Sequence, residues 1–191
     1  MVVALKRAGG VKRQGGAHAR RALEAPSWTA HNCTILAVDT AERSGWAISI
    51  GGVLFDSGEF NMLSQPAEVR RVCRRAMATV ELEGLAVVLV LESPFAGLGQ
   101  GQYRGAWRVA FREAGGRLTV QVQPSVWRSR VLGFTHPREI VRQAERTRSL
   151  HDVARLHSRS PGSDEAAAVC IGYWASYAGE VAKKLPCRSA P

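Results

Sequence analysis

The stretch TILAVD at residues 34–39 decides the fold class of this chain. It is an almost unbroken apolar run that closes on a carboxylate, Asp39. Strands buried on both faces of an α/β sheet have this composition, because helices cover both faces and no position alternates toward solvent. We therefore predict a buried strand here, within an α/β domain.

The chain repeats the pattern at residues 86–92, AVVLVLE, which also end on a carboxylate, Glu92. Between the two runs, apolar segments at 46–50 and 53–55 flank a Gly-Gly pair. Two glycines accept the positive φ angles of a tight turn, so we predict a β-hairpin.

Helical periodicity follows each of these elements. Apolar residues recur every three or four positions after Pro66 and again over residues 103–114. Residues 118–122 predict a further strand, and Ser163 is placed to cap a last helix that begins at Asp164. The order predicts an α/β layer with a mixed sheet.

The length of 191 residues suits one domain with flanking segments. Residues 1–31 are rich in Gly, Ala, Lys and Arg without a hydrophobic period, which predicts a disordered basic arm. We expect the folded domain to span 32–184, with an arginine-rich, partly helical stretch at 128–159 and a flexible tail at 185–191.

The net positive charge of the chain indicates which kind of binding partner to expect. The chain has 26 Lys and Arg against 16 Asp and Glu, a net charge of +10, which favours a polyanion: nucleic acid ahead of an anionic membrane surface. Arginine forks onto phosphate in a bidentate way that lysine cannot. The expected DNA-contacting arginines lie on the outer faces of two predicted helices: Arg70, Arg71, Arg74, Arg75, Arg104, Arg108 and Arg112.

Other features predict a cytoplasmic location. The longest apolar run, residues 85–91, is far shorter than a membrane span, and no secretory signal is visible. The four cysteines are far apart and lack metal-ligand spacing, as expected of reduced thiols.

Four acids stand at positions suited to chemistry: Asp39, Glu92, Asp164 and Glu165. The first two end buried strands, where an unpaired carboxylate costs several kcal/mol of desolvation. A divalent cation between them would offset both charges, and oxygen ligands suit Mg²⁺ or Mn²⁺. The alternative is structural: such acids also cap helices or pair with a nearby arginine.

Four segments resemble RuvC-like Holliday junction resolvases, especially phage and prophage members. Residues 35–47 are similar to the family's first strand with its following Gly-Trp-Ala, and 87–94 to its second acidic strand. Residues 122–128 resemble its strand-Pro-x-x-Trp segment, and 164–171 its last acidic helix.

The resemblance implies an RNase H-like fold: a five-stranded mixed sheet flanked by helices. It also implies a homodimer that cleaves four-way junction or other branched DNA, a crossover junction endodeoxyribonuclease of DNA recombination and repair. Two Mg²⁺ ions, which Mn²⁺ can replace, would serve each active site. Asp39 would bridge both ions, Glu92 and Asp164 would each hold one, and Glu165 would orient the attacking water.

One position departs from the family pattern. A second acid usually follows three residues after the first on the last helix, and here that residue is Ala167. Glu165 is one substitute. His151, Asp152 and His157 are others, although a solvated basic helix is the favoured interpretation of that stretch.

The Gly-rich loop at 93–103 adds two aromatic residues, Phe95 and Tyr103. Either could stack on an unpaired base at a junction, and ordinary packing is the alternative for both.

Two rival functions stay open at this point. One is an RNase H-like nuclease acting on RNA or hybrid substrates. The other is a nucleic-acid-binding protein of the same fold with weakened catalysis, which the missing acid at Ala167 keeps in view.

Overall fold

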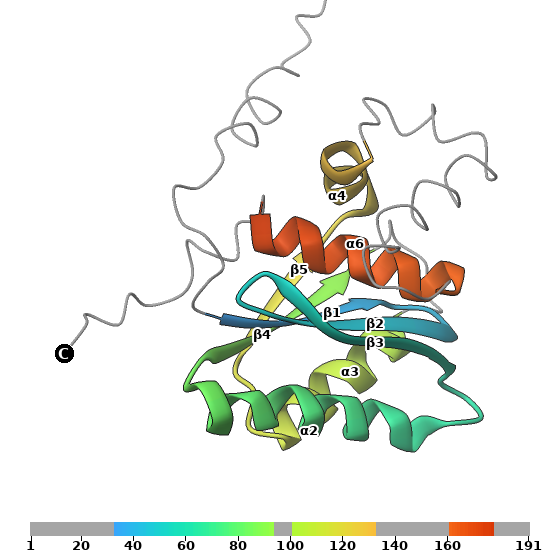
Figure 1. The fold of residues 1–191 in the computed structure, drawn as a ribbon. Coiled ribbons are helices and arrows are strands. Elements are labelled where there is room, and N and C mark those ends of the chain that lie inside the picture. The colour runs from blue at the N-terminus through green and yellow to red at the C-terminus, as the bar shows by residue number, and fades with distance from the viewer. Residues whose placement is uncertain (1–32, 94–100, 133–160, 178–191) are drawn as a thin grey trace, which may run out of the picture.

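The computed structural model describes residues 33–93, 101–132 and 161–177 (Figure 1). The expected basic arm, the C-terminal tail and most of the 128–159 stretch lie outside these residues. Within the described part of the chain, no helix has the length and apolar character needed to cross a membrane.

A five-stranded sheet forms the centre of the domain, in the order β3-β2-β1-β4-β5. β1 pairs antiparallel with β2 and β2 with β3, whereas β1–β4 and β4–β5 are parallel, so the predicted mixed sheet is confirmed. The strands are β1 (Cys33–Asp39), β2 (Arg43–Ile50), β3 (Val53–Asn61), β4 (Ala86–Glu92) and β5 (Leu118–Val122).

Helices cover both faces of the sheet (Figure 1). α2 and α3 lie against one face, α6 lies across the other, and α4 packs beside α6. The described helices are α2 (Pro66–Glu83), α3 (Gly101–Glu113), α4 (Pro124–Val131) and α6 (Ser163–Tyr177).

Side-chain alternation along β1 divides the core into two layers. Ile35 and Ala37 pack with α6, whereas Leu36 and Val38 pack with α2 and α3. Alternate residues of a strand share a face, so Asp39 follows Ala37 toward α6. On β4, Val88 and Val90 also belong to the α6 layer. Glu92 therefore reaches the same face as Asp39.

The structure corrects three boundaries. Both hairpin strands are longer than predicted, because β2 and β3 stay paired as far as Arg43 and Asn61. Pro124 not only ends a strand but also begins α4, where a missing N–H is tolerated. The last helix starts at Ser163 rather than Asp164, and the Gly162 carbonyl accepts its first backbone bond, from Ala166.

Candidate active site

Two of the candidate acids lie at the carboxyl ends of adjacent parallel strands. β1 and β4 are in register up to the pair Val38 and Leu91, and Asp39 and Glu92 are the next residues. Both point toward α6, as the alternation requires. The sheet therefore brings together two acids that are separated by more than fifty residues in the sequence.

A close backbone approach brings α6 to the same place. A Cβ built on Gly45 would lie 1.8 Å from the carbonyl oxygen of Asp164, so only glycine leaves room for this contact. Gly45 is itself the antiparallel partner of Asp39. The first turn of α6 thus rests on the strand beside Asp39, and three of the four predicted acids converge.

Burial and the neighbouring acids shift the pKa of Asp39. The pKa of Asp39 lies well above its usual range, first because burial disfavours its charge. The charge of Glu92, a side-chain hydrogen bond with Glu92 and the charge of Asp164 raise it further, and Arg128 opposes them. Such a hydrogen bond needs a proton, and the raised pKa of Asp39 favours the protonated form of that carboxyl.

Glu92 is held by two side chains from α4. Its carboxylate is 6% exposed. Oε1 accepts a bond from the Trp127 indole Nε1 at 2.9 Å and one from the Arg128 guanidinium at 3.2 Å. The Arg128 guanidinium also stacks over the Trp127 ring, 5.0 Å from its centroid. These two donors fix the orientation of the carboxylate.

Trp127 and Arg128 received no role from the sequence, although their segment was part of the family resemblance. A signal was present. Val122, the last residue of β5, pairs with Glu92, and Pro124 begins the next helix. Residue 127 lies about one helical turn after Pro124, so its side chain is on the side of α4 that faces the end of β4.

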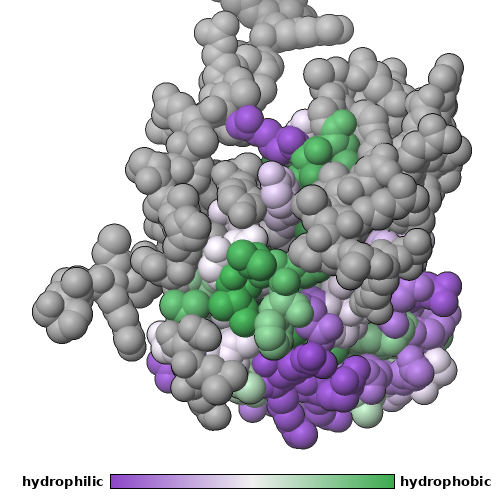
Figure 2. Space-filling view, in the orientation of Figure 1, coloured by the Kyte–Doolittle hydropathy of each residue, from purple (hydrophilic) through white to green (hydrophobic). Residues whose placement is uncertain are grey.

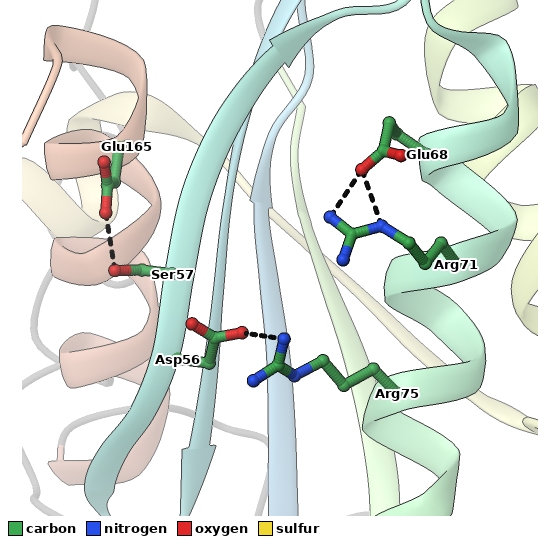
Figure 3. A network of polar contacts seen from close by, with 6 residues as sticks. All are labelled: Asp56, Ser57, Glu68, Arg71, Arg75 and Glu165. Atoms are coloured by element: carbon green, nitrogen blue, oxygen red, sulfur yellow. Dashed lines mark hydrogen bonds and ion pairs between the residues drawn. The ribbon is translucent and has the colours of Figure 1, made fainter.

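Glu165 takes a different place from the other acids. It is buried, and its Oε1 accepts a bond from the Ser57 hydroxyl on β3 at 2.6 Å (Figure 3). It is not among the charges that shift the Asp39 pKa. Ala167 is 2% exposed and lies in the core between α6 and the sheet, so no acid stands three residues after Asp164.

The donor set fits a hard divalent cation. Asp39, Glu92 and Asp164 offer only oxygen atoms, and a cation would offset both the burial of the Asp39 charge and its repulsion by the other two acids. Within residues 33–93, 101–132 and 161–177, no group of three or more His, Cys, Asp or Glu side chains stands ready to coordinate a metal. Since Arg128 already binds Glu92, the acids would have to regroup slightly around an ion.

Three of the four arginines on α2 have local partners, whereas no ion pair is recorded among the described residues for the fourth, the exposed Arg74. Arg70 forms an ion pair with Glu113 at 3.1 Å. Figure 3 shows the other two contacts: the Arg75–Asp56 ion pair at 2.9 Å and the bond that Arg71 Nε donates to Glu68 at 2.7 Å. Figure 2 shows hydrophilic surface gathered where α2 lies in Figure 1. This surface belongs to the layer opposite α6.

Arg104 on α3 lies closer to the acids. Its guanidinium donates to the Ser93 hydroxyl at 2.9 Å, and Ser93 directly follows Glu92. Tyr103 packs against the α2–α3 layer and lines a groove of about 420 Å³ between those helices. Phe95, His151, Asp152 and His157 lie outside the described residues.

Comparison with solved structures shows an RNase H-like fold. RuvC of Thermus thermophilus matches with a TM-score of 0.51 and 16% identity, over 76% of this chain and 98% of that one. A second match, with a TM-score of 0.51 and 17% identity, is T. thermophilus RuvC in complex with Holliday junction substrate, over 74% of this chain and 91% of that one. No family model matches the sequence, and the comparison with curated proteins found no match.

Proposed function

We propose that this protein is a metal-dependent, structure-selective endodeoxyribonuclease that cleaves four-way or other branched DNA. One observation carries the proposal: the ends of β1 and β4 and the first turn of α6 bring Asp39, Glu92 and Asp164 together. There burial, and after it the charges of Glu92 and Asp164, raise the pKa of Asp39. Buried like charges in one place are typical of a site built for a cation. The junction-bound RuvC structure with the same fold supports the choice of substrate.

The three acids have distinct tasks in this proposal. Asp39, central to the cluster, would contact both Mg²⁺ ions, and Glu92 and Asp164 would each hold one. When bound, the ions supply Lewis acidity that activates water and stabilises the attacking and leaving oxygens. Trp127 and Arg128 keep the Glu92 carboxylate from turning away, as outer-shell partners of metal ligands do.

Two arginines are placed to bind the backbone of the substrate near the acids. Arg128 already touches Glu92, and Arg104 donates to the neighbouring Ser93. A phosphate brought to this site would meet both guanidinium groups, which favour bidentate contact. The more distant arginines of α2 and α3 would add affinity that does not depend on sequence.

A substrate panel tests the proposal. The protein is incubated with a fixed four-way junction, an RNA–DNA hybrid and plain duplex, each with Mg²⁺ and with EDTA. We expect cleavage of the junction in Mg²⁺ alone. Preferred cleavage of the hybrid would favour the rival RNase H-like activity instead. Binding of the junction without cleavage in Mg²⁺ or Mn²⁺ would mean that the acid missing at Ala167 has left a binding protein.

A second cleavage assay, on a symmetric junction, tests the proposed homodimer. A symmetric junction presents two equivalent strands, and a dimer would cut both within the lifetime of one complex. A circular substrate that extrudes the junction distinguishes paired cuts, which linearise it, from single nicks. We expect linear product to appear without accumulation of the nicked form.

A further inference from the structure

β3 turns two polar side chains toward the start of α6. The register between β2 and β3 shifts at Ile48 and Ser49, so that β3 carries one extra residue, Phe55. A bulge of this kind reverses the side-chain alternation of a strand. Ser57 and Glu59 consequently face α6, whereas Asp56 faces α2, as Figure 3 shows for Ser57 and Asp56.

Both side chains contact the first turn of α6. Ser57 donates to the Glu165 carboxylate at 2.6 Å, and Glu59 Oε2 accepts a bond from the Glu165 backbone N–H at 3.5 Å. Glu59 also fills the space beside Gly162, where a Cβ would lie 2.1 Å from Oε2. The exposed Arg43 holds the other oxygen of Glu59 at 3.4 Å.

These contacts replace the cap that the sequence predicts. Ser163 lies within the helix, and the carboxylate that accepts a bond from the Glu165 backbone N–H in its first turn comes from Glu59, more than a hundred residues earlier. A negative charge at this end also suits the helix dipole. The tie between β3 and α6 is therefore specific to the turn that carries Asp164.

We propose, on the basis of the function proposed above, that Glu59 and Ser57 are positioning residues for Asp164. Gly45 supports the Asp164 backbone from the sheet, and the two β3 side chains hold the next residue, Glu165, from the flank. Asp164 is thereby fixed relative to Asp39 without either β3 side chain touching the metal. Glu59 is not among the charges that shift the Asp39 pKa, which agrees with a place outside the acid cluster.

A purely structural cap and a positioning residue differ in what their loss changes. Loss of a cap lowers the stability of the helix and leaves the bound metal unaffected. Loss of an outer-shell contact weakens metal affinity or activity by about 10- to 100-fold. Metal binding therefore separates the two roles, because it can be measured without DNA.

The experiment measures Mn²⁺ affinity of the full chain by calorimetry and junction cleavage across a Mn²⁺ series. We expect Glu59→Ala to weaken Mn²⁺ binding about tenfold, with DNA affinity unchanged and cleavage recovering at high Mn²⁺. Ser57→Ala should act in the same direction with a smaller effect. Glu59→Gln keeps the acceptor for the Glu165 amide and should retain most of the affinity. Glu113→Ala, which removes another ion pair on the opposite face, should bind Mn²⁺ normally.

Asp164→Asn is the reference that separates the two proposals. If it binds Mn²⁺ as the unmodified protein does, the acid cluster is not the metal site and the proposed function fails. If it loses Mn²⁺ affinity while both Glu59→Ala and Ser57→Ala bind normally, the site stands and the positioning role is overturned. Should Glu59→Ala fail to fold, normal Mn²⁺ binding by Ser57→Ala is enough to overturn it.

Discussion

The two faces of the sheet hold their charges in opposite ways. On the α2 side, arginines meet carboxylates one to one across open surface, as in Arg70–Glu113 and Arg75–Asp56, with side chains 23–60% exposed. On the α6 side, three acids share one place, and Arg128 is the cation that offsets them. Three of the four arginines on α2 are therefore balanced locally, whereas the acids beside α6 outnumber the arginine that opposes them.

This difference separates exposed ion pairs, which affect the stability of the fold little, from crowded acids, which are suited to binding a cation. Exposed ion pairs are worth about 0–1 kcal/mol each, so evenly paired charges on α2 place little demand on the fold. Crowded carboxylates oppose folding, because each must lose water beside a like charge. Such an arrangement is expected where a cation or substrate supplies the compensation.

The largest effect is expected from Asp39→Asn. This variant should lower junction cleavage by at least about a hundredfold and keep junction binding. The reason is that several kcal/mol of transition-state stabilisation depend on the ions. The same change should stabilise the metal-free protein at neutral pH. The folded-state pKa of Asp39 is raised, so its contribution to stability is complete below its ordinary value of 3.8 and is lost as the pH rises through the raised value.

Melting temperatures measured in EDTA between pH 4 and 8 test whether Asp39 lowers the stability of the protein as the pH rises. The unmodified protein should lose more stability with rising pH than Asp39→Asn, and the gap should close near pH 4. A variant that cuts junctions at the normal rate, or melts lower than the unmodified protein at pH 7, would remove Asp39 from the acid cluster.

Two glycine-to-alanine substitutions, one on each face of the sheet, are expected to change stability in opposite directions. At Gly45, on the α6 face, an added Cβ meets backbone atoms of Asp164, which cannot move aside cheaply. Gly45→Ala should cost about 3 kcal/mol and reduce cleavage, since the first turn of α6 must shift. At Gly105 in α3, an added Cβ meets nothing within 4 Å. Gly105→Ala should add about 0.5–1 kcal/mol, because alanine is the better helix former.

Urea unfolding gives both stabilities, and cleavage is assayed below each unfolding transition. Equal behaviour of the two variants would show that α6 does not rest on Gly45 as described.

The fold was predictable because its two central strands can be identified from local composition. Two apolar runs, 34–39 and 86–92, have the composition of buried parallel strands, and both end on acids. Parallel pairing then brings Asp39 and Glu92 to one edge of the sheet. Local pattern and topology agree here, so the sequence alone predicts most of this part of the site.

The remainder of the site depends on contacts that leave no local signal. Ser57 meets Glu165 across 108 positions, and it does so only because a bulge at Phe55 reverses the alternation of β3. Periodicity assigns the hairpin but does not reveal an extra residue within it. The N-terminus of α6 is a second example. Local spacing predicts that Ser163 caps the helix, whereas in the structure the distant Glu59 accepts the bond from the Glu165 backbone N–H.

Two tryptophan substitutions compare how buried indole groups on the two faces of the sheet affect cleavage. Trp127 and Trp107 are both fully buried, and each donates its indole N–H: Trp127 to the Glu92 carboxylate, and Trp107 to the Ser44 hydroxyl on the other face at 3.4 Å. Trp127→Phe should reduce cleavage about tenfold, because Glu92 loses a donor that orients it. Trp107→Phe should lower stability without changing the cleavage rate. Similar cleavage by both variants would show that the α4 contact does not orient Glu92 for catalysis.

The smallest expected effect concerns the arginines, and salt dependence resolves it. Arg108 and Arg112 are exposed on α3, and no ion pair is recorded for either among the described residues, whereas Arg70 and Arg71 are paired with Glu113 and Glu68. A phosphate contact adds about 0.9 to the slope of log K against log salt. An arginine already paired must first give up its carboxylate, so it contributes less to DNA affinity.

The double variant Arg108→Ala with Arg112→Ala should therefore lower the slope for junction binding by about 1 or more, and Arg70→Ala with Arg71→Ala by clearly less. Both remove two positive charges, so a long-range effect of net charge alone would change the two slopes equally. Equal slopes would thus mean that the whole basic surface attracts DNA without defined contacts. A larger change for Arg70 and Arg71 would place the DNA across α2, and the local ion pairs there would have to open on binding.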